Sequence, residues 1–96
     1  MAKIITIAQV EDRTKWEASF ASRSGFFREM GKDIGLQSPV FYGTSNDDQI
    51  IVIEEVSDPQ KALDALHSTQ TAEAMKQDGV RIDLVQNFVA DRQLAF

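Results

Sequence analysis

Residues 49–79 constrain the fold more than any other part of the chain. This segment begins with an apolar run, Ile50-Ile51-Val52-Ile53, and continues into a helical pattern that ends at Gly79. β-Branched residues favour strands, and a strand that is apolar at consecutive positions has no face left for water. Both faces of this strand therefore need a cover. We expect the second helix to cover one face and a partner subunit to cover the other.

The composition limits the class of protein and its partners. A chain of 96 residues predicts a single domain, and the absence of cysteine excludes disulfides, thiolate zinc sites and a cysteine nucleophile. The net charge of -5 gives no general attraction to nucleic acid or to anionic lipid, so neither is an expected partner. Residues 1–7 hold too short an apolar stretch for a signal peptide, and no stretch reaches membrane-spanning length. We therefore expect a cytoplasmic protein.

The first half of the chain predicts a strand, a helix and a second strand. Residues 3–10 are mostly apolar on both faces, and Asp12 is a suitable cap for a helix that begins at Arg13. Gly25 is expected to kink or split this helix, and two further glycines supply stop signals at its end. The apolar stripe of the helix comprises Trp16, Phe20, Phe27, Met30 and Ile34, and the stop signals are Gly31 and Gly35.

The second half predicts a hairpin, a broken helix and a last strand. Residues 40–44 form a strand entered through Pro39, and the short polar loop 45–48 requires it to pair antiparallel with the strand that begins at Ile50. Ser57 or Asp58 caps the next helix, a break at residues 68–71 follows, and residues 72–77 form a short final helix. Residues 80–90 alternate apolar and polar side chains, which predicts the fourth strand.

This order of elements is the ferredoxin-like βαββαβ arrangement, an α+β fold. It predicts a four-stranded antiparallel sheet with both helices on one face. The other face would be bare in a monomer, although the first and third strands are apolar on both faces. A homodimer that joins two sheets face to face satisfies this pattern.

Three features of the sequence are similar to those of a known protein family. They are Trp16 early in the first helix, the hairpin of residues 42–56, and the segment 58–80. Together they resemble the dimeric α/β-barrel superfamily, which includes antibiotic-biosynthesis monooxygenases, stress-responsive barrel proteins, muconolactone isomerases and cyclase-like members. The resemblance covers about residues 3 to 90. It implies two subunits whose sheets close a barrel, with a ligand cavity in each subunit between sheet and helices.

The chemistry of the superfamily transfers only in outline. Members that bind haem use a histidine ligand in the second half of the chain, where this sequence offers only His67. Cofactor-free monooxygenases arrange Trp, Asn, Tyr or Arg around a phenolic substrate, and no motif here fixes such a set. We expect no cofactor and no metal site, since no second histidine or matched carboxylate spacing accompanies His67. The acidic run Asp47-Asp48 is interpreted as turn chemistry.

Arg23 and His67 are the candidate catalytic residues. His67 could act as acid or base, but it also lies at the edge of the apolar side of its helix, an ordinary place for an amphipathic residue. Arg23 falls inside the apolar stripe of the first helix, where an unpaired guanidinium is costly to bury. It would anchor an anionic or enolate-like ligand, pair with a carboxylate such as Glu54, or extend its charged end to solvent.

The candidate ligand-binding residues are aromatic side chains with a few polar groups. An aromatic wall between helix and sheet suits an apolar cyclic ligand, and core packing alone is the competing interpretation. Glu54 and Glu55 point to opposite faces of their strand, so one points inward and is either paired or has a raised pKa. Asn87 could donate to a ligand or lie at the barrel interface. The full set is Trp16, Phe20, Phe27, Tyr42, Glu54 and Asn87.

Two hypotheses of different classes follow. In the first, the chain is a small cofactor-independent monooxygenase or a cyclase or isomerase that acts on an apolar cyclic molecule. In the second, it is a non-catalytic ligand-binding or stress-response dimer whose cavity is filled by its own side chains. Fold alone does not decide between them.

Overall fold

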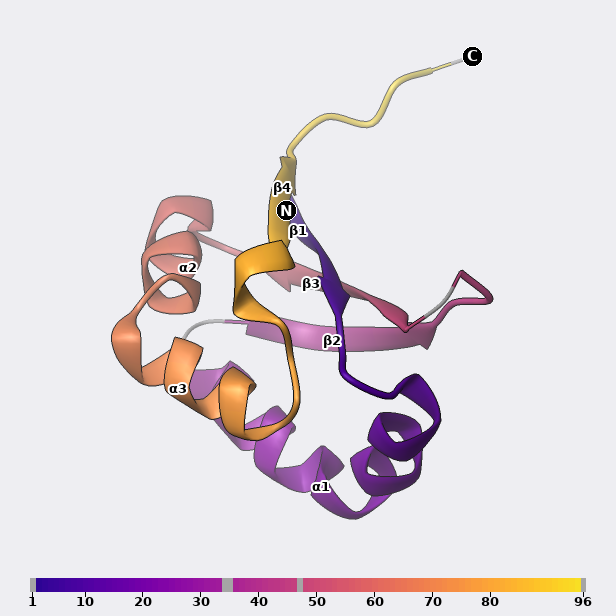
Figure 1. Cartoon of the computed structure of the whole chain (residues 1–96). Helices are drawn as coiled ribbons and strands as arrows, with labels where there is room; N and C mark the ends of the chain where they lie inside the picture. The colour runs from indigo at the N-terminus through magenta and orange to yellow at the C-terminus, as the bar shows by residue number, and fades with distance from the viewer. Residues whose placement is uncertain (1, 34–35, 47, 96) are drawn as a thin grey trace.

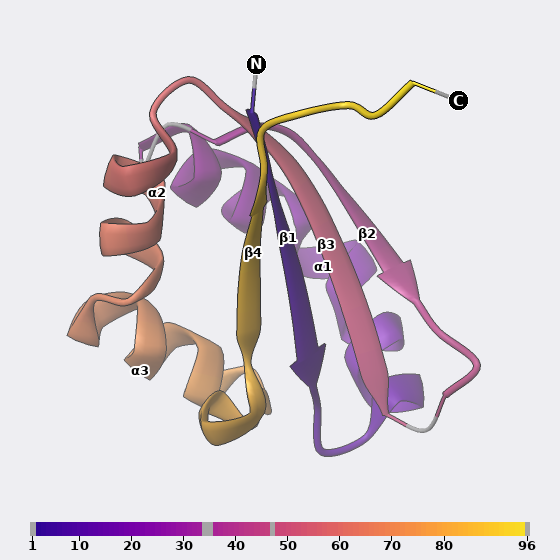
Figure 2. The same ribbon diagram turned by 90° about the horizontal axis from the view of Figure 1, so that it is seen from above.

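Within residues 2–33, 36–46 and 48–95, which the structure describes, a four-stranded antiparallel sheet carries three α-helices on one side (Figure 1). The structure is a computed structural model, and the side chains of residues 23–31, 33 and 36–38 lie outside its description. Figure 2 shows the strands side by side, with α1 behind β3 and β2 and with α2 and α3 beside β4.

The sheet has the strand order β2-β3-β1-β4. Its central strands are β1 (Ala2–Gln9) and β3 (Gln49–Val56), and its edges are β2 (Leu36–Gly43) and β4 (Gln86–Ala90). All three neighbouring pairs are antiparallel. The predicted ferredoxin-like α+β fold and its antiparallel hairpin are thus confirmed.

Helix α1 (Arg13–Asp33) begins where Asp12 was expected to cap it. The carboxylate of Asp12 accepts a hydrogen bond from the backbone N–H of Lys15 at 3.1 Å, and that of Asp48 accepts from the N–H of Arg13 at 3.0 Å. The helix continues through Gly25 and past Gly31, so the predicted split and the first stop signal are wrong. A glycine inside a helix costs only about 1 kcal/mol, which the rest of a 21-residue helix outweighs. Gly35 lies outside the described residues.

Helices α2 (Pro59–Leu66) and α3 (Thr69–Gln77) confirm the predicted break but not its extent. Asp58 caps α2, as one of the two predicted alternatives, by accepting from the N–H of Lys61 at 3.1 Å. Ser68 caps α3 in the same manner, through the N–H of Thr71 at 3.2 Å. The final helix therefore begins three residues earlier than predicted, because the polar cluster supplies a cap rather than a longer break.

The predicted strand 80–90 is wrong in its first half. Gly79, at φ +84°, ends α3, and Val80 then forms an isolated antiparallel bridge with Val10. A short 3₁₀ turn, η1 (Ile82–Leu84), separates this bridge from β4, closed by a hydrogen bond from Leu84 N–H to the Arg81 carbonyl. Ile82 and Leu84, whose alternation with polar residues predicted a strand, lie exposed in this turn.

Pro39 was predicted at the beginning of its strand. In the structure it lies within β2. The pairing of β2 with β3 shifts register between Gln37 and Val40, around the proline. Because proline has no N–H to donate, an edge strand and a register irregularity are the places where a sheet accommodates it.

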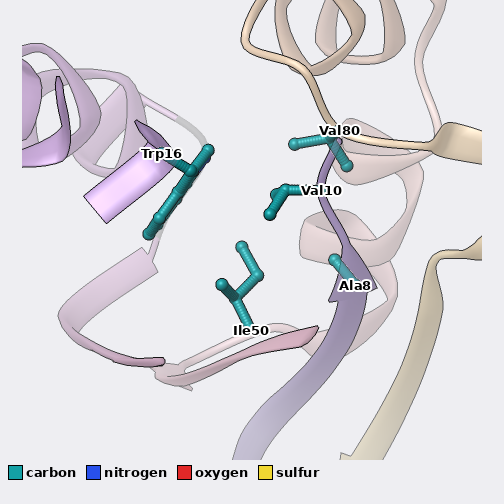
Figure 3. Close-up of a cluster of buried hydrophobic side chains, with 5 residues drawn as sticks. All are labelled: Ala8, Val10, Trp16, Ile50 and Val80. Carbon is teal, nitrogen blue, oxygen red and sulfur yellow. The ribbon is translucent and has the colours of Figure 1, made fainter. Parts of the chain in front are cut away.

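The inner, helix-covered face of the sheet holds the core in two clusters. The larger contains Ala8, Val10, Trp16, Ile50 and Val80, and Figure 3 shows the Trp16 ring on α1 pointing toward Val10 and Ile50. The smaller contains Ile4 and Val56 from the sheet and Ala62 from α2. The helices thus bury one face of β1 and β3. The sequence predicted such a cover for one face of the doubly apolar strands.

The outer face carries apolar side chains without a helix over them. On the central strands these side chains are half-buried, and on the edge strands Val40, Tyr42 and Phe88 are 46%, 51% and 50% exposed. The register places Phe88 beside Ile5, Val40 beside Ile53 and Tyr42 beside Ile51, so they form one surface. We call it the outer apolar face; it comprises Ile5, Ile7, Val40, Tyr42, Ile51, Ile53 and Phe88.

Candidate functional site

A polar band crosses the inner face between the two core clusters. Along β1 the inward residues are Ile4, Thr6 and Ala8, and along β3 they include Val56, Glu54 and Ile50. Ile4 and Val56 belong to the smaller cluster, whereas Ala8 and Ile50 belong to the larger one. Thr6 and Glu54, 9% and 6% exposed, therefore lie between two apolar regions. The polar band is defined here as Thr6, Glu54 and Asn87.

One row of side chains spans all four strands at the level of Thr6. Phe41 on β2 is opposite Val52 on β3, Val52 is opposite Thr6 on β1, and Thr6 is opposite Asn87 on β4. Residues directly opposite on neighbouring strands share a face of the sheet. The row thus runs from an aromatic ring at one edge to an amide at the other, over about 14 Å.

Asn87 is held from two sides. The Thr6 hydroxyl donates to Asn87 Oδ1 at 2.7 Å, and Asn87 Nδ2 lies 3.1 Å from His67 Nε2. An amide nitrogen can only donate, so His67 Nε2 is the acceptor in this arrangement. His67 is the exposed C-cap of α2. The structure thus brings two predicted site residues, Asn87 and His67, into one network and adds Thr6, which the sequence analysis missed.

Glu54 is the inward member of the Glu54-Glu55 pair. Its Oε2 atom is buried and has no hydrogen-bond partner among the described residues. Burial raises the pKa of the Glu54 carboxyl from its ordinary value of 4.5 to about 7, because the charged form loses its hydration. Of the two predicted alternatives for the inward carboxylate, a raised pKa is found, whereas pairing with Arg23 falls on a side chain outside the described residues.

Trp16, Phe20 and Phe41 form an aromatic cluster at the Phe41 end of the row. Trp16 and Phe20 stack with ring centroids 5.1 Å apart, and the Phe20 and Phe41 rings lie 4.7 Å apart at a tilt of 48°. The predicted proximity of Trp16 and Phe20 is observed. Phe41 was missed because the sequence analysis selected its neighbour, Tyr42, and adjacent strand residues point to opposite faces.

Tyr42 lies on the outer apolar face, away from the helices. Its placement opposite Ile51 and its 51% exposure separate it from the aromatic cluster. The prediction that it lines the same cavity as Trp16 is therefore wrong for this subunit, since the strand phase turns Phe41 inward instead. Arg23 and Phe27 belong to α1, but their side chains lie outside the described residues.

A cavity of about 360 Å³ lies between the start of α1 and the end of α3. Trp16 and Val10 give it an apolar wall, and Glu11, Asp12 and Lys15 contribute charged groups. Glu54, Thr6 and Asn87 do not line it. Trp16 is thus the member of the aromatic cluster that also lines this cavity, and its indole N–H has no hydrogen-bond partner among the described residues.

The described part of the chain contains neither a clustered set of metal ligands nor a helix that could span a membrane. There, no group of three or more histidine, aspartate and glutamate side chains is placed to hold a metal ion. None of the helices in the described ranges combines the length and the apolar character that crossing a bilayer requires.

No family model and no curated protein matches the sequence. Solved structures do match its fold. A dimeric ferredoxin-like protein from an uncultured marine organism is 13% identical, with a TM-score of 0.64, and the match covers 100% of this chain and 98% of that one.

Two oxygenases of Streptomyces have the same fold. The monooxygenase from the gene ActVA-Orf6 of Streptomyces coelicolor, solved with nanaomycin D, is 10% identical, with a TM-score of 0.65 and coverage of 99% of this chain and 89% of that one. SnoaB, a cofactor-independent oxygenase from Streptomyces nogalater, is 12% identical, with a TM-score of 0.62 and coverage of 98% and 94%. At these identities the likeness establishes the fold and not the activity. The chain thus has the ferredoxin-like fold found in dimeric proteins and in antibiotic-biosynthesis monooxygenases, as its resemblance predicted.

Proposed function

We propose that the protein is a cofactor-independent enzyme, a monooxygenase or a cyclase or isomerase, that acts on an apolar cyclic molecule bound on the inner face of its sheet. The observation that carries this proposal is the polar band. The carboxyl group of Glu54, whose Oε2 is buried and has no hydrogen-bond partner among the described residues, lies between two apolar clusters, where burying a polar atom without a hydrogen bond costs stability. Groups kept at such a cost gather at functional sites.

The row that contains Thr6 suits a cyclic ligand with one polar end. Aromatic rings at the Phe41 end would contact the ligand rings, and the amide of Asn87 would contact an oxygen at the other end. The two Streptomyces oxygenases of the same fold support the choice of an enzyme, because one is cofactor-independent and the other was solved with nanaomycin D.

A second copy of the chain is the proposed cover for the outer apolar face. Contiguous apolar surface of this kind marks an interaction site in a protein that remains in solution. A second identical sheet presents the same apolar side chains, and a neighbour of the same fold is dimeric. The homodimer through sheet faces thus explains why β1 and β3 are apolar on both sides.

Binding of 2-tetralone, a two-ring ketone, tests the proposal through the fluorescence of Trp16, the single tryptophan. Phe41→Leu and Tyr42→Leu are a matched pair, because each removes one ring from β2, on opposite faces. We expect saturable quenching of the native protein and about tenfold weaker binding in Phe41→Leu, with little change in Tyr42→Leu. Equal weakening in both variants, or no saturable quenching in the native protein, would contradict an inner-face site.

The alternative, a non-catalytic dimer with a self-filled interior, is favoured by one observation. Trp16, Phe20 and Phe41 stack on one another, as they would if they filled the space themselves. This alternative predicts the same dimer but no binding of 2-tetralone.

A further inference from the structure

We propose that the cavity between the start of α1 and the end of α3 binds a small zwitterion, an apolar α-amino acid. In this site the ligand ammonium contacts Glu11, the ligand carboxylate contacts Lys15, and the apolar side chain lies against Trp16. The site is separate from the inner face of the sheet and does not depend on the proposed function.

One face of α1 forms the first wall of the cavity. Asp12, Lys15, Trp16 and Ser19 line it, and their spacing of three and four residues places their side chains on one side of the helix. The Asp12 carboxylate is engaged as the helix cap, and the Ser19 hydroxyl donates to the Trp16 carbonyl at 3.2 Å. The main groups that this wall offers to a ligand are therefore the Lys15 ammonium and the Trp16 side chain.

The end of α3 and the turn after it form the second wall, which comprises Gln77, Asp78 and Gly79. A hydrogen bond from the Glu11 N–H to the Gly79 carbonyl, 2.8 Å long, ties the two walls together. The bridge between Val10 and Val80 joins the same two segments. The cavity is thus held open by the fold itself, which lowers the cost of ordering a ligand in it.

Glu11 and Lys15 carry opposite charges at this cavity and are not paired with each other. Neither side chain forms an ion pair or a hydrogen bond with another described residue. The Glu11 carboxylate lies over the second wall, with its Oε2 4.0 Å from the position that a Cβ atom on Gly79 would take. Lys15 comes from the first wall. A ligand that carries both an ammonium and a carboxylate completes the two pairs at once.

The volume of the cavity and its apolar wall define the rest of the ligand. About 360 Å³ lies near the lower end of the range for small-molecule sites, about 300–1,000 Å³, and suits a single amino acid. Trp16 and Val10 supply the apolar contact. Trp16 is only 7% exposed, and its indole N–H has no hydrogen-bond partner among the described residues. A ligand carboxylate at the neighbouring Lys15 supplies the acceptor that this donor lacks.

Three ligands with the same phenyl ring test the site. They are L-phenylalanine, phenethylamine, which lacks the carboxylate, and 3-phenylpropanoate, which lacks the ammonium. Trp16 is the single tryptophan, so its indole N–H gives one signal in a proton–nitrogen correlation NMR spectrum. We expect L-phenylalanine to shift this signal saturably and to bind about fivefold more tightly than either analogue.

Lys15→Met and Glu11→Gln assign the two contacts, because each variant removes a charge and nearly keeps the size of the side chain. In Lys15→Met, L-phenylalanine should bind no more tightly than phenethylamine. In Glu11→Gln, it should bind no more tightly than 3-phenylpropanoate. Lys61→Met and Glu73→Gln are the matched controls, since both residues are exposed and neither lines the cavity, and they should keep the native affinities.

Equal affinity of the native protein for L-phenylalanine and for either analogue would overturn the zwitterion site, as would the lack of a saturable shift. Native discrimination retained in Lys15→Met and Glu11→Gln would overturn the roles of these two residues. Binding of 2-tetralone is measured independently of these ligands, so failure of this site leaves the proposed function as it stands.

Discussion

Glu54 shows how one side chain can oppose the stability of the fold that holds it. Ile4, Val52 and Val56 around it are apolar and buried, and the carboxyl lies among them without a hydrogen bond to its Oε2 from the described residues. Because burial raises its pKa, the folded state holds this proton more tightly than the unfolded chain does. Its effect on stability must therefore depend on pH.

We predict that Glu54→Gln stabilises the protein as pH rises. Below pH 4.5 the carboxyl is protonated in both states, whereas between 4.5 and about 7 only the unfolded state releases the proton, so the native protein loses stability. Above about pH 7 the variant should be more stable than the native protein by roughly 3 kcal/mol relative to their difference at pH 4. Urea unfolding at pH 4, 6 and 8 measures this difference, with Glu55→Gln as the matched control. A difference that stays constant over this range would contradict the raised pKa.

The identity of the inward carboxyl marks the limit of sequence reasoning at this scale. Adjacent residues on a strand point to opposite faces, so the sequence predicts that one of Glu54 and Glu55 is buried. Which one depends on the phase of the strand against the helices. The same uncertainty in strand phase led to the prediction that Tyr42 faces inward, whereas Phe41 does. The contact between Thr6 and Asn87 joins residues 81 positions apart and needs the β1–β4 register, which no local pattern contains.

At the scale of elements, the helices depend on side-chain caps placed at the breaks between them. Asp58 closes the first turn of α2, and Ser68 closes that of α3, where the Thr71 hydroxyl also donates to the Ala65 carbonyl at 2.8 Å. Helices of 8 and 9 residues are too short to be stable alone, so their ends count for more than in a long helix.

We predict that Asp58→Ala and Ser68→Ala each lower the free energy of unfolding by about 1 kcal/mol, because a backbone N–H loses its acceptor. The two caps share no partner, so the double variant should lose about the sum. Asp64→Ala is the control, since Asp64 is exposed within α2 and, in the described part of the chain, its carboxylate accepts from the Gln60 side chain and caps no helix. Chemical denaturation measures all four variants, and an equal loss in Asp64→Ala would rule out a cap-specific effect.

Local signals predicted the Asp12 cap and, as one of two alternatives, the Asp58 cap, but they did not predict the Ser68 cap. They also failed where tertiary contacts decide. Asp12, Asp58 and Pro59 mark helix starts through chemistry that lies within four residues. The turn η1 has the same alternation of apolar and polar residues as a strand, and in the structure it follows the bridge between Val80 and Val10, a contact that no local pattern contains. Likewise, the continuity of α1 through Gly25 is a property of the whole helix and not of the glycine.

At the scale of the molecule, the outer apolar face is the main unexplained surface of an isolated subunit. Its two central isoleucine pairs, with Val40, Tyr42 and Phe88 at the edges, would present apolar side chains to water. The helices cannot cover it because they are on the other side of the sheet (Figure 2). The proposed homodimer removes this surface from solvent.

We predict that the native protein is a dimer and that Ile53→Lys shifts it toward the monomer. Ile53 lies between Ile5 and Val40 on the outer apolar face, where a lysine would bury an unpaired charge in the interface. Gln60→Lys, on the exposed surface of α2, adds the same charge away from the interface. Native mass spectrometry of the three proteins measures the masses. A monomeric native protein would refute the face-to-face dimer.

The two-sided apolar character of β3 has a further effect, on how the strands find their alignment during folding. In most sheets a slip by one residue exposes the core side chains, and this penalty selects the alignment. On Ile50 to Ile53 such a slip exchanges one apolar side chain for another, so the strand itself discriminates weakly. Closure of the hairpin, with Thr44 N–H bonded to the Gln49 carbonyl at 3.2 Å, and the tie from Val10 N–H to the Asp48 carbonyl at 2.9 Å then select the pairing. In a strand that is apolar on both faces, the register is therefore selected by the hydrogen bonds of the loop at its end and not by its own side chains.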